Sequence, residues 1–155
     1  MRIAVGADEN VHLVSEIRRF LEERGHTVEL FGAAAGLEEA WGQTAVTVGE
    51  RVAEGLHDFG VVCCWTGTGV SIAANKVPGI RAALCADAQT ARGARKWNDA
   101  NVLALSLRAT SPSVAREILE AWLEEPYGGT EEPSLQKIRE AEAHSSAVPS
   151  RSSAR

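Results

Sequence analysis

The stretch CCWTGTGVSIAANK (residues 63–76) places thiols, hydroxyls and glycines next to one another in a chain of 155 residues. Cys64 ends an apolar run that is typical of a buried strand, and a turn with Gly67 and Gly69 follows it before an apolar helical segment. Free backbone N–H groups at the start of a helix favour negative charge, and such a field can activate a neighbouring thiol. The stretch therefore predicts a site in which Cys64 acts as a base or a nucleophile beside an anion-binding turn.

The spacing of this turn argues against the two common nucleotide-binding motifs. A dinucleotide fingerprint needs a third glycine, and Ile72 stands at that position. A phosphate-binding P-loop needs a lysine directly after its last glycine, and Lys76 comes too late. A simpler interpretation of Cys64 stays open, because a cysteine at a strand end often only fills apolar space. Cys63 and Cys85 lie within apolar runs and are expected in the core.

Composition restricts the class of protein and of partner. A length of 155 residues with 45% hydrophobic content predicts one globular domain. A formal net charge of -5 argues against a basic surface for nucleic acid or an anionic membrane. No apolar run approaches the roughly 20 residues that cross a bilayer, and MRIAVGADE is typical of a strand rather than of a cleavable signal. We therefore expect a cytoplasmic protein.

The cysteines and histidines do not support a disulfide or a metal site. Two of the three cysteines are neighbours, which cannot easily bridge, so reduced thiols are expected. The four histidines lie far apart along the chain, and the common zinc-binding spacings are missing. We expect small-molecule and protein partners, and no metal.

Short branched apolar runs alternate with longer helical segments, which is typical of a parallel sheet covered by helices. Five continuous apolar runs are predicted to be strands, and this composition indicates burial on both faces. The predicted strands cover residues 2–7, 27–32, 59–65, 80–85 and 101–106. Six helices are predicted between and after these strands. The first ends at Gly25, the second covers 44–58, and the third runs from the glycine turn to before Pro78. The last three cover 88–97, 111–125 and 134–143.

The last part of the chain carries boundary signals. Ser111 and Pro112 predict an N-cap and the first position of a helix. The last predicted helix is followed by HSSAVPSRSSAR, which is small, polar and short of core residues. We therefore predict a domain over residues 1–143 and a disordered tail over 144–155.

The run CWTGTGVSIAANKVPGIRAALC, with WNDANVLALSLR downstream and GADE at the end of the first strand, resembles a known family. It is similar to ribose-5-phosphate isomerase B and the galactose-6-phosphate isomerase subunits over nearly the whole chain. The resemblance implies a three-layer Rossmann-like α/β fold, with a five-stranded parallel sheet and helices on both faces. It also implies a homodimer or a dimer of dimers with sites between subunits, and interconversion of an aldose and a ketose without a cofactor.

Anchored on SIAANK, the resemblance assigns roles to individual residues. Cys64 falls on the family's base, Thr66 on its companion hydroxyl, and Asp8 on an aspartate that binds sugar hydroxyls. The loop that holds the developing enediolate falls on Gly67, Thr68, Gly69, Val70 and Ser71. Asn98 falls on an asparagine that contacts substrate, and Arg108 on an arginine that could meet an anion. Simpler roles remain, because Asp8 also suits a helix cap and Asn98 the start of a turn.

The chain departs from the family where an anion is held. Glu9 and Trp97 replace histidines, of which the first contacts phosphate and the second opens the sugar ring. Thr130 and Ser134 replace two arginines, with two acidic residues between them that also suit a solvated helix start. Charge-assisted hydrogen bonds contribute about 1.5 to 3 kcal/mol each. The substrate is therefore expected to lack a phosphate or to carry a cationic or polar group, with Glu9 binding it and Trp97 stacking on a sugar face.

Two other functions remain open from the sequence. The chain could be one subunit of a hetero-oligomeric isomerase, in which another chain supplies the missing histidine and arginines. It could also be a sugar-binding family member without catalysis. Retention of Cys64 and Thr66 favours the enzyme, because proton transfer needs a base close to both reacting carbons.

Overall fold

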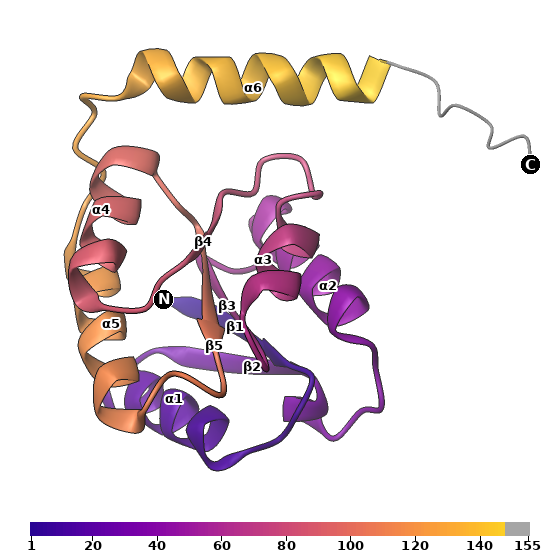
Figure 1. The fold of residues 1–155 in the computed structure, drawn as a ribbon, viewed down its shortest axis with the longest axis vertical. Coiled ribbons are helices and arrows are strands. Elements are labelled where there is room, and N and C mark those ends of the chain that lie inside the picture. Colours follow the sequence, from indigo (N-terminus) through magenta and orange to yellow (C-terminus); the bar gives the residue numbers. More distant parts are fainter. Residues whose placement is uncertain (148–155) are drawn as a thin grey trace, which may run out of the picture.

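The computed structural model describes residues 1–147, which form a sheet with helices on both faces (Figure 1). The strands are β1 (Arg2–Ala7), β2 (Thr27–Gly32), β3 (Phe59–Cys64), β4 (Ala82–Leu84) and β5 (Val102–Ser106). They form one five-stranded sheet in the order β2-β1-β3-β5-β4, and all neighbouring strands are parallel. The predicted α/β class with a five-stranded parallel sheet is confirmed.

The helices divide the molecule into three layers. They are α1 (His12–Glu23), α2 (Trp41–Ala53), α3 (Thr68–Ala74), α4 (Ala88–Asn98), α5 (Pro112–Glu124) and α6 (Glu132–Ala147), with a short 3-10 helix over Ala33–Ala35. One apolar core joins the sheet to α1, α4 and α5, and a second joins the opposite face to α2 and α3. Because side chains alternate along a strand, Cys63 belongs to the first core and Cys64 to the second.

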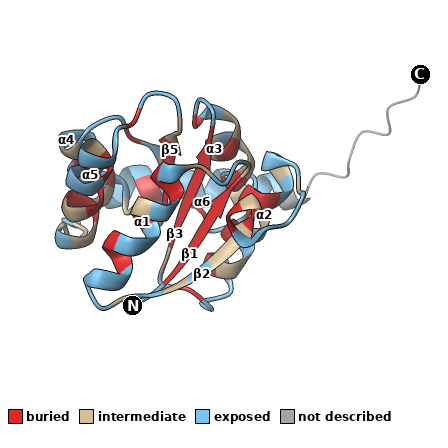
Figure 2. Ribbon diagram, turned by 90° about the horizontal axis from the view of Figure 1, so that it is seen from below, coloured by how far each residue is buried: buried red, intermediate tan, exposed pale blue. Residues whose placement is uncertain are grey.

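Burial differs between the centre and the edges of the sheet. The three inner strands β1, β3 and β5 are almost fully buried, as the red ribbon in Figure 2 shows. The edge strands β2 and β4 are only partly buried, so the prediction of burial on both faces was wrong for them. An apolar run indicates that a segment forms a strand of the sheet. How exposed that strand is depends on whether other strands pair with it on both sides.

The helix boundaries follow the local signals in most places. Ser111 caps α5 by accepting a hydrogen bond from the Val114 N–H at 3.3 Å, with Pro112 at the first position, which confirms that prediction. The helix α2 begins at Trp41, three residues before the predicted start at residue 44. No helix within residues 1–147 is both long and apolar enough to cross a membrane.

The predicted disordered tail over residues 144–155 begins inside α6, because this helix continues through residues 144–147. Its apolar residues do not follow a strong helical stripe, and Leu135 is its buried member within the side chains described. The rest of the predicted tail, residues 148–155, lies outside the described part of the chain. In Figure 1, α6 crosses the molecule at the end where β5 begins.

Candidate active site

The predicted catalytic residues lie where the inner strands end. Ala7 of β1 pairs with Cys63 of β3, and Cys64 pairs with Ser106 of β5, so the ends of these strands lie side by side. After β1 the chain continues to β2 on one side, and after β3 it continues to β4 on the other side, so the strand order reverses between β1 and β3. Ligands of open parallel sheets bind at such a switch point. Asp8, which follows Ala7, therefore lies beside Cys64 at this edge.

Backbone contacts fix the segment after Cys64. The Leu107 N–H donates to the Cys64 carbonyl at 2.9 Å, and the Arg108 N–H donates to the Trp65 carbonyl at 3.1 Å. The Ser106 Oγ donates to the same Trp65 carbonyl at 2.9 Å. The ladder between β3 and β5 thus continues past both strands, and Cys64 is held on a rigid support at the sheet edge.

The three cysteines differ in what they can do chemically. Cys63 has no exposed surface, and burial raises the pKa of its thiol to about 12. Burial likewise raises the pKa of Cys85 to about 12. Cys64 keeps 6% of its surface exposed at the end of β3. Cys63 and Cys85 therefore belong to the core, as predicted, and Cys64 is the thiol placed to meet a ligand.

The turn after Cys64 requires glycine at its first position. Gly67 has φ of +76°, and a Cβ there would lie 2.6 Å from Leu84 Cδ1 and 2.9 Å from the Leu105 carbonyl carbon. The Ser71 N–H donates to the Gly67 carbonyl at 3.2 Å, so this amide is already used within the turn. The amides of residues 68–70 lie in the first turn of α3 and lack partners within the helix. They can donate hydrogen bonds to a bound oxygen.

Hydroxyls line the same turn. Thr66 Oγ1 and Thr68 Oγ1 lie 2.8 Å apart and share a hydrogen bond. Both residues are exposed, in contrast to the buried Val70 that anchors α3 in the second core. The turn therefore combines backbone donors with a pair of hydroxyls that can donate or accept a proton.

Asp8 carries an unusual carboxyl group. Its Oδ1 is buried and has no hydrogen-bond partner within residues 1–147. Burial raises the pKa of Asp8 above its ordinary value, and the neighbouring charge of Glu9 raises it further, while its own backbone N–H acts in the opposite direction. A buried carboxyl oxygen without a partner is unusual in a folded protein, and it is more typical of a functional site than of a simple helix cap.

Asp8→Asn is expected to raise the melting temperature at pH 7. The raised pKa means that the carboxylate is less stable in the folded than in the unfolded protein, so its ionisation costs stability above the folded pKa. The gain should shrink as the pH falls and vanish below the unfolded pKa of about 3.9, where both states carry the proton. Circular dichroism melts between about pH 3 and pH 8 measure it. A loss at pH 7, or a gain that does not depend on pH, contradicts this account.

Arg108 and Glu9 add opposite charges at the same edge. Both side chains are exposed. Within residues 1–147, neither of them forms an ion pair. The Arg108 N–H donates to the Trp65 carbonyl, so the backbone of Arg108 lies beside the segment that follows Cys64, and its exposed side chain starts from there.

The structure places Trp97 and Asn98 at the opposite end of the sheet. Both lie at the end of α4, shortly before Asn101, whose carbonyl accepts from the Gly60 N–H at the start of β3. Cys64 lies four positions after Gly60 along β3, which corresponds to about 13 Å at 3.3 Å per residue. One chain therefore does not bring Asn98 to Cys64. The sequence already indicated this placement at the opposite end, because both residues come shortly before the fifth strand and not after a strand.

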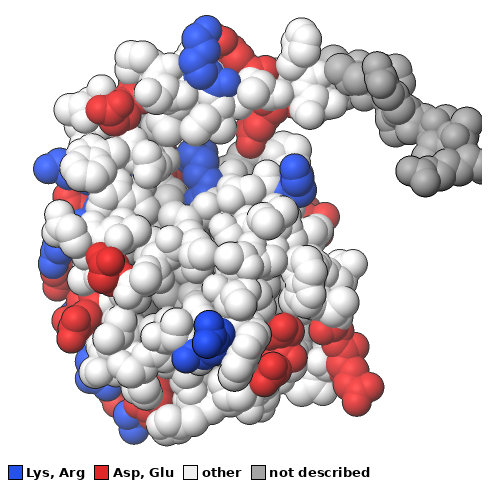
Figure 3. All heavy atoms as spheres, in the orientation of Figure 1, with Lys and Arg blue, Asp and Glu red and all other residues white. Residues whose placement is uncertain are grey.

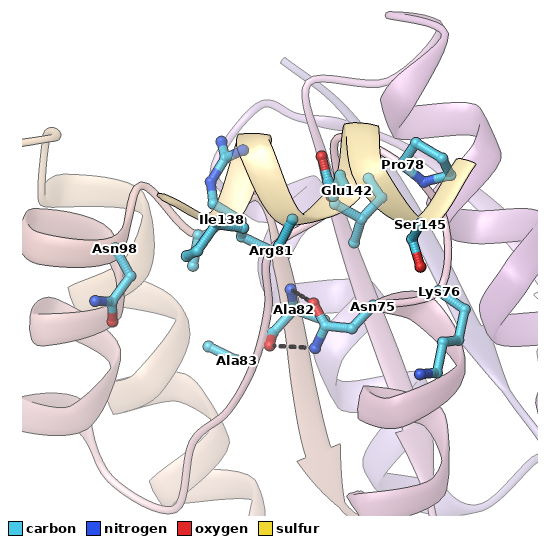
Figure 4. Close-up of a pocket in the computed structure, with 13 residues that line it drawn as sticks. Asn75, Lys76, Pro78, Arg81, Ala82, Ala83, Asn98, Ile138, Glu142 and Ser145 are labelled. Carbon is cyan, nitrogen blue, oxygen red and sulfur yellow. Dashed lines mark hydrogen bonds between the residues drawn. The ribbon is translucent and has the colours of Figure 1, made fainter. Parts of the chain in front are cut away.

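A cavity of about 740 Å³ lies at that opposite end, below α6. Figure 4 shows Asn98 at one side of it and Glu142 of α6 above, and Figure 3 shows Lys and Arg atoms in the hollow. The cations that line it are Lys76 and Arg81. Asn75 closes its floor by exchanging hydrogen bonds of 2.9 and 2.8 Å with the Ala82 carbonyl and N–H.

Thr130 and Ser134 belong to the same end of the molecule. The segment before them is tied to α4, because the Gly128 N–H donates to the Lys96 carbonyl at 2.8 Å. Both side chains are exposed. The predicted site residues thus form two groups, one around Cys64 and the other around Asn98.

Trp41 was not predicted as a site residue. It begins α2, is 48% exposed, and lies against Gly69 of the turn. The sequence around it carries no motif, and the contact arises only because α2 packs beside α3.

Within residues 1–147, no group of three or more His, Cys, Asp or Glu could hold a metal ion. The chemistry available at the Cys64 edge is that of a thiol, a carboxyl, two hydroxyls and backbone donors. These groups can move a proton and hold an oxyanion.

Comparisons with known proteins show the family of this chain. The model of a family described as Ribose/Galactose Isomerase matches residues 3–138. D-erythrulose-4-phosphate isomerase of Pectobacterium atrosepticum is 39% identical over 141 residues, covering 89% of this chain and 93% of that protein. Ribose-5-phosphate isomerase B of Escherichia coli is 40% identical over 129 residues, covering 83% and 87%.

A solved structure is similar over most of its length. Ribose-5-phosphate isomerase B from Clostridium thermocellum superposes with a TM-score of 0.88 at 40% identity, covering 94% of this chain and 99% of that one. The fold, the family match and these identities agree with one another. The chain therefore belongs to the ribose/galactose isomerase family and is an isomerase of the aldose-ketose type.

Proposed function

We propose that this protein interconverts an aldose and a ketose through an enediolate, with Cys64 carrying the proton and without a cofactor. The observation that carries the proposal is the placement of Cys64 between Asp8 and the glycine turn at the switch point of the sheet. A base, a carboxyl and oriented N–H donors at one edge are what this reaction needs.

The groups at this edge have separate tasks in the reaction. The thiolate of Cys64 removes the proton from C2 of the aldose, the electron pair forms the C1–C2 double bond, and negative charge moves to O1. The amides of residues 68–70 hold that charge. A proton then moves from O2 to O1. We assign this transfer to Asp8, whose Oδ1 has no partner within residues 1–147, and to the hydroxyl pair of Thr66 and Thr68. The Cys64 thiol returns its proton to C1, which completes the ketose and restores the thiolate.

The complete site is proposed to form between two copies of the chain. Asn98 and the cavity below α6 lie at one end of the sheet, and Cys64 lies at the other. A symmetric dimer that places the Asn98 end of one copy against the Cys64 end of the other would complete two equivalent sites. In that arrangement Trp97, Thr130 and Ser134 also come from the partner copy.

We propose that this protein binds the phosphate group of a sugar phosphate only weakly. The named relatives act on sugar phosphates. In this chain Glu9 is exposed at the Cys64 edge, while Thr130 and Ser134 are uncharged at the other end. Arg108, whose backbone N–H donates to the Trp65 carbonyl, is a cation that could still meet a phosphate near the Cys64 segment. A phosphate would have to give up water for fewer charged partners, whereas a neutral sugar loses less.

Glu9→His, Thr130→Arg and Ser134→Arg together should strengthen the binding of ribose 5-phosphate. One restored charge-assisted contact of about 1.5 to 3 kcal/mol corresponds to roughly a ten- to hundredfold lower Kd. Free ribose should bind about equally well before and after the change, because it has no anion to hold. Calorimetric titration of both sugars into both proteins measures the difference.

The control carries the same change in net charge on α1, with Ser15→Arg, Glu22→Gln and Glu23→His, which are all exposed. It should leave both affinities unchanged. The proposal of weak phosphate binding is wrong if the unmodified protein converts ribose 5-phosphate at micromolar KM, the tight end of the usual range, and clearly prefers it to free pentoses and hexoses.

A further inference from the structure

Trp41 covers the glycine turn without belonging to either apolar core. A Cβ built on Gly69 would lie 3.1 Å from Cε3 and Cζ3 of Trp41 and 3.3 Å from Cη2, so the six-membered ring packs directly on the Gly69 α-carbon. The side chain is nevertheless 48% exposed. A large aromatic residue gains only part of its burial energy in such a place. Core packing therefore does not account for its position.

The backbone below Trp41 is held firmly. Thr44, one turn further along α2, is fully buried, and its N–H donates to the Ala40 carbonyl at 3.1 Å. The Thr44 hydroxyl donates to Glu39 Oε2 at 2.7 Å. Val48 on the next turn lies in the second core with Cys64. The indole thus stands on a fixed support and closes one side of the turn.

We propose that Trp41 is a positioning residue that covers the glycine turn and keeps water away from the enediolate held there. This role rests on the function proposed above. Between removal and return of the proton, the Cys64 thiol and the intermediate can exchange hydrogen with solvent. A wall over the turn reduces that exchange, and it strengthens the N–H contacts to the oxyanion because they act in a drier site.

The share of hydrogen that is transferred within the sugar tests this role. Ribose 5-phosphate and ribose, each deuterated at C2, are converted in ordinary water, and NMR measures the deuterium that arrives at C1 of the ketose. Trp41→Ala should lower the transferred share at least about twofold and kcat about tenfold, with a smaller change in KM, because the intermediate becomes exposed. Trp41→Phe keeps an aromatic wall and should restore most of both values.

Two further variants separate shielding from loss of structure. Leu56→Ala removes another exposed apolar side chain, near the far end of α2, and should change neither value. Gly69→Ala places a methyl group 3.1 Å from the indole and should lower the transferred share while Trp41 is still present. Melting curves confirm that each variant is folded.

The role of Trp41 is overturned if Trp41→Ala transfers the same share of deuterium as the unmodified protein, whatever its kcat. A different result would contradict the proposed function itself. If the unmodified protein neither converts nor exchanges either labelled sugar, the proposed function fails, and the role of Trp41 fails with it.

Discussion

Cys64→Ser is expected to lower isomerase activity at least about a hundredfold, which is the low end of what a positioned general base contributes. A serine hydroxyl has nearly the same shape as the thiol but ionises far less readily, so the C2 proton has no effective acceptor. Cys63→Ser should be mild by comparison. Cys63 points into the opposite core, and burial raises the pKa of its thiol to about 12, so it cannot serve as the base.

The comparison is made as turnover per folded molecule, measured together with thermal unfolding. Cys63→Ser buries a hydroxyl in an apolar core and is expected to lower the melting temperature. Cys64→Ser, at the sheet edge, is expected to change it less. Equal losses of turnover from both substitutions would remove the assignment of Cys64 as the base.

The strands could be predicted from the sequence because buried parallel strands leave continuous apolar runs. Their positions in the sheet could not, since β4 is wholly apolar and yet lies at an edge, whereas β2 carries Thr27 and Glu29 among its apolar residues. The run 80–85 contributes only Ala82–Leu84 to β4. Just before that strand, the Arg81 N–H donates to the Asn101 side chain at 2.8 Å instead of joining the ladder. Such side-chain contacts shorten an edge strand without any change in composition.

The candidate site could be predicted to the extent that it follows strand ends. Asp8, Cys64 and the glycine turn follow β1 and β3 directly, so a parallel sheet brings them together. Trp41 depends instead on how α2 and α3 pack, which no local pattern reports. Asn98 shares a predicted role with Cys64 but precedes a strand, and this places it at the other end of the sheet. A role assigned by resemblance says nothing about which copy of the chain supplies the residue.

Mixed dimers of two damaged chains are expected to recover about half of the unmodified activity, because a closed two-fold dimer contains two equivalent sites. One chain carries Cys64→Ser, and the other carries Asn98→Ala, each with a different affinity tag. If each site takes its Cys64 edge from one copy and Asn98 from the other, the mixed dimer has one site with both substitutions and one with neither. The homodimer of either variant has two damaged sites and should stay weakly active.

The matched control pairs Cys64→Ser with Thr66→Ala, two residues that lie on the same edge of one chain. Each site of that mixed dimer then contains one of the two substitutions, so activity should not return. Dimers are isolated through both tags in turn, and turnover is measured with the sugar that the unmodified protein converts fastest. Because Gly60 and Cys64 lie about 13 Å apart along β3, a site built within a single chain would have to bridge the length of the sheet. Failure of the first pair to recover, with both tags present in one dimer, would show that Asn98 does not act at the partner's Cys64.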